Sequence, residues 1–128
     1  MEKDFDSWNI KKKAIHHEGV HKFYHEREVW WCALGVNVGS EQDGTGENND
    51  RPVLILRGVS KHTCIIVPLT SSQGKHRLGV PIGTIHEKNT SAILSQMRII
   101  DIKRLLYRIT YINQNIFISV QKAAKEFL

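Results

Sequence analysis

The sequence has few of the features that mark membrane or secreted proteins. Its longest apolar stretch, around residues 65–69, is far shorter than the roughly 20 residues that a membrane span needs. Residues 1–13 mix acids with lysines and have no apolar core, so they do not resemble a secretory signal peptide. The two cysteines, Cys32 and Cys64, lie in apolar runs, which favours buried reduced thiols over a disulfide or a reactive thiol. We therefore expect a cytoplasmic protein with no membrane segment.

The motifs of nucleotide-binding and hydrolytic enzymes are also missing. The chain has no G-x-x-x-x-G-K-[ST] or G-x-G-x-x-G loop, no C-x-x-C pair and no G-x-S-x-G elbow. Only three acids follow residue 50, namely Glu87, Asp101 and Glu126, so the acidic pairs that two-metal nucleases use are lacking. If the protein is a nuclease, we expect it to need neither a metal ion nor another cofactor.

One short motif points to zinc. His17, Glu18 and His21 match the H-E-x-x-H pattern, and His25 continues the spacing of one helical turn. However, four of the seven histidines crowd into this segment, Gly19 lies at its centre, and few apolar residues are present to hold a rigid site. We favour a solvated polar segment; a zinc peptidase and incidental metal affinity are the weaker alternatives.

The charge distribution suits a polyanionic partner. The 128 residues are enough for one domain, and 41% hydrophobic with 24% charged residues is ordinary globular usage. The net charge is +5, and residues 75–128 hold nine Lys or Arg against three acids. Such a basic half fits RNA, DNA or an acidic protein segment, although charge alone is equally consistent with a solvated basic surface.

The apolar pattern predicts a mainly β protein. Strands are expected at 29–34, 51–56 and 63–69, with weaker strand signals at 80–85, 92–100 and 107–112. Residues 39–50 and 71–79 read as long polar loops, and 101–106 as a helical turn. Pro52 and Pro68 fit strand ends or edges better than central ladder positions. Four or five short strands with little helix between them predict a small, largely antiparallel barrel.

Helices are expected only near the two ends of the chain. Residues 11–25 have some helical character, which Gly19 weakens. At the C-terminus, Asn113 is a suitable N-cap for an amphipathic helix. Its apolar stripe is expected to contain Ile116, Val120, Ala123 and Phe127. This helix would close the barrel.

Arg51 and Thr70 are the candidate chemical groups. Arg51 stands where a charged loop meets an apolar strand, and Thr70 ends the next strand. If these strands form a hairpin, the two residues lie near one another at one end of the sheet. A guanidinium and a hydroxyl beside a phosphate can stabilise developing negative charge and orient an oxygen. From position alone, a strand-end charge and an ordinary loop hydroxyl are the simpler interpretations.

An ordered series of segments changes that balance. It comprises REVWWCALG (27–35), VGSEQDG (38–44), RPVLIL (51–56), IVPLTSS (66–72) and ILSQMRIIDIKRL (93–105). In this order the series closely resembles the MazF/PemK/Kid ribonuclease toxins of bacterial toxin-antitoxin modules. The resemblance covers roughly residues 27–128, which leaves 1–26 as an N-terminal extension. It implies a small Src-homology-3-like barrel with a C-terminal helix, as in the gyrase-poisoning CcdB toxins.

The resemblance also implies an activity. Family members are homodimers that cut single-stranded RNA at short sequences without metal, and an antitoxin with an extended acidic segment blocks them. The ribose 2′-OH attacks its own 3′ phosphodiester and leaves a cyclic phosphate and a free 5′-OH. A non-catalytic binding module on the same barrel, such as a CcdB-like protein inhibitor or an inactive RNA or antitoxin binder, is the alternative.

Site residues follow by position within the matching segments. Arg51 corresponds to the catalytic arginine, which would stabilise the phosphorane, and Thr70 to the catalytic threonine, which would help to deprotonate or orient the 2′-OH. Arginine is a poor base because its pKa is above about 12. The RNA-binding positions carried over are Ser40, Glu41, Gln42, Gln96 and Arg98.

Three departures from the family pattern bear on target and mechanism. The loop from Asp43 to Asp50 is longer than usual. Ser40 and Ser95 replace the histidine and the aspartate of the plasmid-borne branch, which favours a mechanism based on Arg51 and Thr70. The extension at 1–26 has no counterpart in the shortest members.

Overall fold

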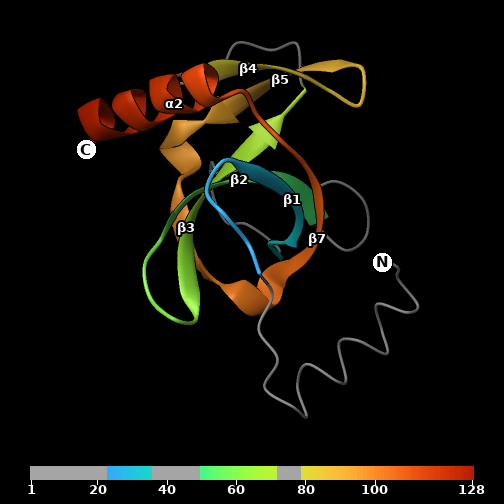
Figure 1. The fold of residues 1–128 in the computed structure, drawn as a ribbon, viewed down its shortest axis with the longest axis vertical. Coiled ribbons are helices and arrows are strands. Elements are labelled where there is room, and N and C mark those ends of the chain that lie inside the picture. Colours follow the sequence, from blue (N-terminus) through green and yellow to red (C-terminus); the bar gives the residue numbers. More distant parts are fainter. Residues whose placement is uncertain (1–22, 36–49, 72–78) are drawn as a thin grey trace.

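The computed structural model describes residues 23–35, 50–71 and 79–128, and these ranges form an antiparallel half-barrel with a helix at its C-terminal end (Figure 1). Within them are seven strands, two short 3-10 turns and one α-helix. The strands are β1 (Glu28–Ala33), β2 (Asp50–Gly58), β3 (Thr63–Thr70), β4 (Gly79–Ile85), β5 (Lys88–Ile93), β6 (Arg98–Asp101) and β7 (Leu105–Tyr111). The 3-10 turns are η1 (Leu94–Gln96) and η2 (Ile102–Arg104), and the helix is α2 (Gln114–Phe127).

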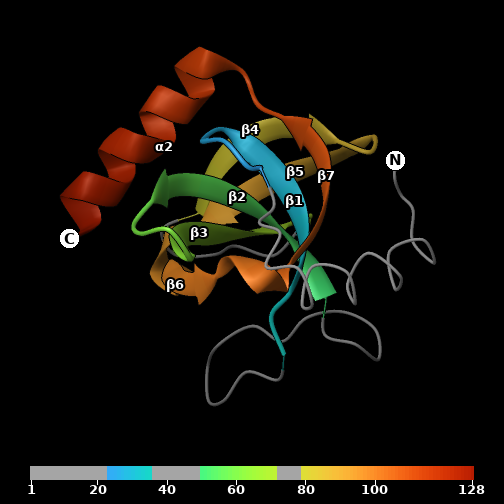
Figure 2. The ribbon, with the colours of Figure 1, turned by 60° about the horizontal axis from the view of Figure 1, so that its bottom comes forward.

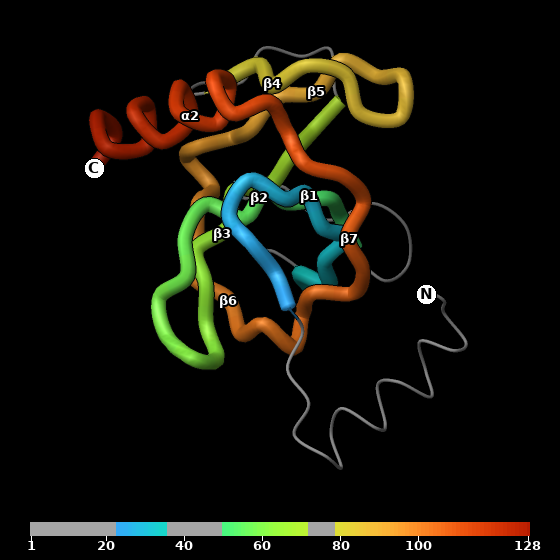
Figure 3. The backbone as a smooth tube through the Cα atoms, viewed as in Figure 1, coloured from blue at the N-terminus to red at the C-terminus, as the bar shows by residue number. Residues whose placement is uncertain are grey.

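Strand β3 organises the sheet because it pairs with three others. The main path runs β4-β5-β3-β2-β1-β7, and β6 pairs with β3 beside this path. One edge of β3 carries β2. Its other edge pairs with β6 over residues 63–66 and with β5 at residues 69 and 70. As a result, β3 passes from the lower part of the barrel to a position beneath the β4–β5 hairpin (Figure 3).

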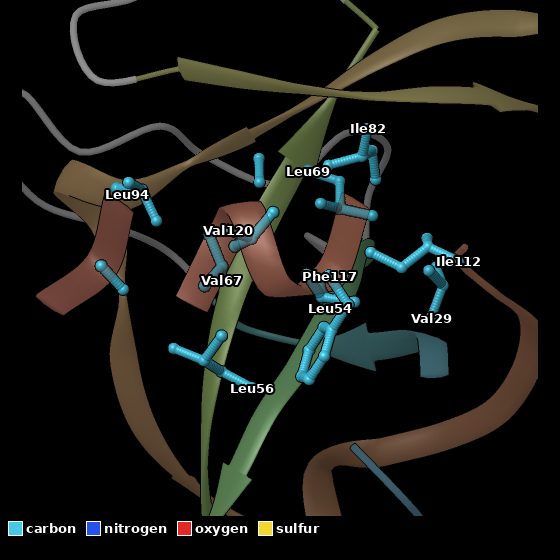
Figure 4. Packing of buried hydrophobic residues seen from close by; sticks show 12 residues of the cluster. Val29, Leu54, Leu56, Val67, Leu69, Ile82, Leu94, Ile112, Phe117 and Val120 are labelled. Carbon is cyan, nitrogen blue, oxygen red and sulfur yellow. The ribbon is translucent and has the colours of Figure 1, made fainter. Parts of the chain in front are cut away.

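Two hydrophobic clusters lie on opposite faces of β2 and β3. Val53 and Ile55 point into one cluster with Cys64 and Ile66, which fills the barrel. The intervening residues of the same strands point into the second cluster, which the β4–β5 hairpin and α2 cover (Figures 2 and 4). Burial on both faces explains why both strands are continuous apolar runs instead of alternating ones.

The expected strand at 92–100 is two strands. Residues 94–96 form the turn η1, in which the Met97 amide donates to the Leu94 carbonyl (3.1 Å). This break lets β5 pair with the end of β3 and β6 with its beginning. The apolar pattern runs through the break because Leu94 is also buried in the core. The count of four or five strands was therefore too low.

Both prolines lie inside central strands, contrary to the expectation of strand ends or edges. Pro52 is opposite Trp31 of β1, and Pro68 is opposite Val53 of β2. The β2–β3 ladder begins at the Val53 and Pro68 pair, and Pro68 also separates the two partners on the other edge of β3. Pro52 lies just before the β2–β3 ladder begins, and Pro68 lies in the gap between the β6 and β5 ladders. Each proline therefore borders the end of a ladder, where a missing amide donor is tolerated.

The C-terminal helix begins as predicted, but its buried face is different. The Asn113 side chain accepts from the amides of Asn115 (2.7 Å) and Ile116 (3.2 Å), which confirms the N-cap. The buried residues are Phe117, Val120 and Ala124, whereas Phe127 is 43% exposed. Figure 4 shows Phe117 and Val120 beside Leu54 and Val67 of the sheet. The buried stripe is therefore rotated from the expected one: Val120 belongs to both, and Ile116 and Ala123 lie at its partly buried edge.

Residues 1–22 lie outside the described part of the chain, including His17, Glu18, His21 and most of the expected N-terminal helix. In the described ranges, no helix is long and apolar enough to cross a membrane.

The buried carboxylate of Glu28 lies where the chain enters the barrel at the start of β1. Glu28 is 7% exposed, and its carboxylate accepts from Trp30 Nε1 (2.9 Å), the His25 amide (2.9 Å) and Arg108 Nη1 (3.3 Å). The His25 ring lies 3.3 Å away. Burial opposes ionisation of Glu28, but these hydrogen bonds outweigh it, so its pKa lies below the ordinary value. Glu28 thus ties β1 and β7 to the chain that enters the barrel.

We expect Glu28→Gln to lower the free energy of unfolding by about 1–3 kcal/mol at neutral pH, because a buried hydrogen-bonded charge is lost. A lowered folded-state pKa stabilises the fold above the unfolded-state pKa, and this contribution disappears as pH falls through the folded value. Thermal melts between about pH 7 and pH 3 should therefore bring wild type and Glu28→Gln together at the acidic end. Exposed Glu126→Gln is the control, and a constant wild-type advantage across this range would contradict the assignment.

Candidate active site

The register of the β2–β3 hairpin places Arg51 opposite Thr70. Val53 pairs with Pro68, and extending this antiparallel register by two residues brings Arg51 across from Thr70 on the same face. The face is that of Val53 and Ile66, which line the barrel core. Both residues therefore stand at the end of the barrel interior.

The two side chains are buried and fixed. Arg51 is 4% and Thr70 8% exposed. Arg51 Nη1 donates to the carbonyl of Leu69 at 3.3 Å, so the guanidinium is attached to the residue that precedes Thr70. A cation in such surroundings acts on a nearby anion more strongly than it would in water. The hairpin thus joins a fixed positive charge and a hydroxyl at one place, as the sequence predicted.

A groove of about 580 Å³ opens beside this pair. Its described lining residues come from β1, β2, β3 and β7 and from the β4–β5 hairpin. Its lining residues are Trp31, Arg51, Pro52, Leu69, Thr70, Ser71, Ile85, His86, Lys88, Thr90 and Ile109.

The ionisable residues on the described walls of this groove are Arg51, His86 and Lys88, and no carboxylate lines it there. The groove is therefore suited to an anion. Trp31 adds an aromatic surface and stacks on Tyr107, with ring centroids 6.5 Å apart and planes inclined by 22°. Phosphates and bases together match such a lining.

Sequence reasoning missed His86 and Lys88. Both lie at the tip of the β4–β5 hairpin, which pairs Ile85 with Lys88 and leaves a two-residue turn of His86 and Glu87. The signal in the sequence was a pair of polar residues between two weak strands. Only long-range packing carries this tip to the groove of Arg51, because β5 pairs with the end of β3.

The other expected site residues fall elsewhere. Gln96 lies in η1 and Arg98 begins β6, and neither lines the groove. Arg98 is opposite Ile66 and is partly buried. Its positive charge acts to lower the pKa of Cys32, against the larger effect of burial. Ser40, Glu41 and Gln42 lie outside the described residues, as does nearly all of the loop from Asp43 to Asp50.

The cysteines are free, buried thiols, as predicted. Burial raises the pKa of Cys32 to about 12 and that of Cys64 to about 11. Cys32 lies opposite Arg51 in the β1–β2 ladder, yet its thiol remains protonated at neutral pH. It is therefore not a nucleophile for the groove. Within the described part of the chain, no three His, Cys, Asp or Glu side chains are grouped to bind a metal ion.

Both thiols should resist alkylation in the folded protein. At pH 8 we expect iodoacetamide to modify native Cys32 and Cys64 at least about a hundredfold more slowly than the urea-unfolded chain, because thiolate is the reactive form. Mass spectrometry of quenched samples measures both rates. Modification of either thiol at the unfolded rate in native protein would show that the raised pKa values are wrong.

The described residues thus form a half-barrel with a C-terminal helix and a basic groove beside Arg51 and Thr70. The sequence matches the family of PemK-like, MazF-like toxins of type II toxin-antitoxin systems over residues 25–128. The chain belongs to this family. The comparison with curated proteins gives no match.

Solved structures of MazF toxins share the fold. MazF from Deinococcus radiodurans (form I) has a TM-score of 0.66 and 15% identity, over 83% of this chain and 96% of that chain. The Mycobacterium tuberculosis toxin MazF-mt6 has a TM-score of 0.57 and 16% identity, over 78% and 94%. A mycobacterial endoribonuclease in complex with its cognate antitoxin has a TM-score of 0.57 and 15% identity, over 83% and 98%. These likenesses confirm the expected small barrel.

Proposed function

We propose that the protein is a sequence-selective endoribonuclease toxin that cleaves single-stranded RNA without a metal ion. The observation that carries the proposal is the cross-strand placement of Arg51 and Thr70 beside a groove whose described ionisable residues are all basic-type side chains. Membership of the PemK-like, MazF-like toxin family supports it.

The proposed chemistry is an internal transesterification. The ribose 2′-oxygen forms a bond to the adjacent phosphorus, the bond from phosphorus to the 5′-oxygen breaks, and a cyclic phosphate and a 5′-OH result. The proton of the 2′-OH passes to water, and the departing 5′-oxygen gains a proton from water. Neither oxidation nor a cofactor is needed for this step to balance.

Arg51 and Thr70 have separate roles in this step. The Arg51 guanidinium keeps its protons, offsets the charge that builds up on the phosphorane, and donates a hydrogen bond to the departing oxygen. The Thr70 hydroxyl accepts from the 2′-OH and orients it for attack in line with the departing oxygen. Their burial fixes both groups before the substrate arrives, so little reorganisation is required.

The partners follow from the same groove. We propose that a cognate antitoxin inhibits the protein by laying an extended acidic segment along the surface of Arg51, His86 and Lys88. A mycobacterial endoribonuclease of similar fold has been solved in complex with its cognate antitoxin, which supports this pairing. We also propose that the active form is a homodimer.

Mapping the ends of a long RNA after incubation tests the activity. Wild type should cut in the presence of EDTA, while Arg51→Ala and Thr70→Val should lose at least about a hundredfold in rate, as expected when a group that stabilises the transition state is removed. Arg57→Ala and Thr63→Val are matched controls, because these residues lie at the opposite ends of the same two strands. Both controls should retain activity within about threefold.

The same assay separates the competing functions. Absence of cutting by the folded wild type would favour a non-catalytic barrel, such as a CcdB-like protein inhibitor. Loss of cutting in EDTA would contradict the metal-free mechanism and return attention to His17 and His21. A single 2′-deoxy nucleotide at the cut site should block cleavage; if that strand is still cut, the 2′-OH is not the nucleophile.

A further inference from the structure

The tip of the β4–β5 hairpin has an unfavourable backbone for the residues it carries. His86 and Glu87 have φ values of 52° and 66°. Positive φ at both central residues defines a type I′ turn, which favours Asn and Gly because larger side chains crowd the backbone there. Glycine would adopt this conformation at no cost, so the turn does not require an imidazole at residue 86.

A bulge in β4 and a hydrogen bond in β5 shape the hairpin whose tip lines the groove. Its register shifts between Pro81 and Gly83, and Gly83 has φ 105°, which marks a bulge in β4. Thr90 Oγ1 donates to the Lys88 carbonyl at 2.9 Å and so constrains the first residues of β5 after the tip. His86, Lys88 and Thr90 line the groove with Arg51 and Thr70, whereas Glu87 does not.

We propose that His86 and Lys88 form a clamp for the RNA backbone, binding a phosphate next to the one that Arg51 holds. This inference rests on the proposed ribonuclease function and extends it to residues on a different element. His86 and Lys88 line the same groove as Arg51, and no carboxylate lies on its described walls. Successive phosphates of a single strand are the anions that several basic-type side chains along one groove would bind.

The clamp is a binding device and not a source of catalysis. Its side chains are exposed, whereas Arg51 and Thr70 are buried. Loss of the clamp should therefore weaken substrate binding and raise KM while the rate at saturating RNA stays close to that of wild type. Loss of Arg51 should reduce that rate itself.

The unusual turn provides a test that separates binding from folding. His86→Gly removes the imidazole but relieves the positive-φ backbone, so the melting temperature should stay the same or rise. Glu87→Gly relieves the backbone equally at a residue outside the groove. Lys88→Gln removes the lysine charge, and Lys103→Gln removes an exposed cation from η2, which is not among the residues that line the groove.

Binding is measured by fluorescence anisotropy with an uncleavable probe, the all-2′-deoxy form of a strand that wild type cuts. His86→Gly and Lys88→Gln should each weaken binding by roughly tenfold. Lys88→Gln should also reduce the slope of log affinity against log salt by about 0.7, as for one lost contact to a single strand. Glu87→Gly and Lys103→Gln should bind within about twofold of wild type.

Each other result overturns the clamp. Unchanged binding by both His86→Gly and Lys88→Gln, with wild type active, removes the clamp and leaves the ribonuclease intact. A fall in the melting temperature of His86→Gly shows that the imidazole serves the fold. Weaker binding of a poly-glutamate peptide with unchanged binding of the strand assigns the tip to an acidic protein segment. If wild type cuts no RNA, the proposed function fails and the clamp fails with it.

Discussion

The antiparallel pairing of β2 with β3 is the constraint on which the rest of the structure depends. The pairing of Val53 with Pro68 sets which residues face the barrel core and which face the helix. A shift by one residue would exchange these two sets and place Arg51 on the wrong face. The same register brings Arg51 across from Thr70, so the pairing that builds the core also assembles the candidate site.

Strand β3 extends this constraint to the groove. Its far edge is shared between β6 and β5, which anchors the β4–β5 hairpin over the end of the barrel. Core packing of Leu69 and Ala92 holds that junction. His86 and Lys88 therefore reach the groove because the buried ladder between β5 and β3 places their hairpin there. The tip itself is exposed and does not pack in the core. Rigid support beneath variable polar tips is a common way to position binding residues.

The parts of the fold that depend on local pattern could be predicted from the sequence. The apolar runs of β2 and β3 and the short turn between them placed Arg51 near Thr70, and Asn113 marked the start of α2. The break at η1 could not be predicted, because Leu94 continues the apolar run while the backbone turns to a new partner. The roles of Arg51 and Thr70 came from the family resemblance, since their positions alone favoured simpler interpretations.

What remained hidden depends on contacts between distant segments. Pro52 and Pro68 looked like edge residues because a sequence does not show where one ladder ends beside another. Around His86 and Lys88 the sequence shows only polar residues between two weak strands, because the proximity of these residues to Arg51 arises from the pairing of β5 with β3.

A double-mutant cycle on single-turnover RNA cleavage tests most directly whether Arg51 and Thr70 act on one phosphodiester. Arg51→Lys and Thr70→Ser retain charge and hydroxyl and should leave measurable rates. If the residues act together, the double variant should lose less than the product of the two single losses, with a coupling of at least about 1 kcal/mol. Arg51→Lys with Thr63→Ser should show no coupling. Losses that multiply for Arg51 and Thr70 as they do for the control pair would contradict a shared site.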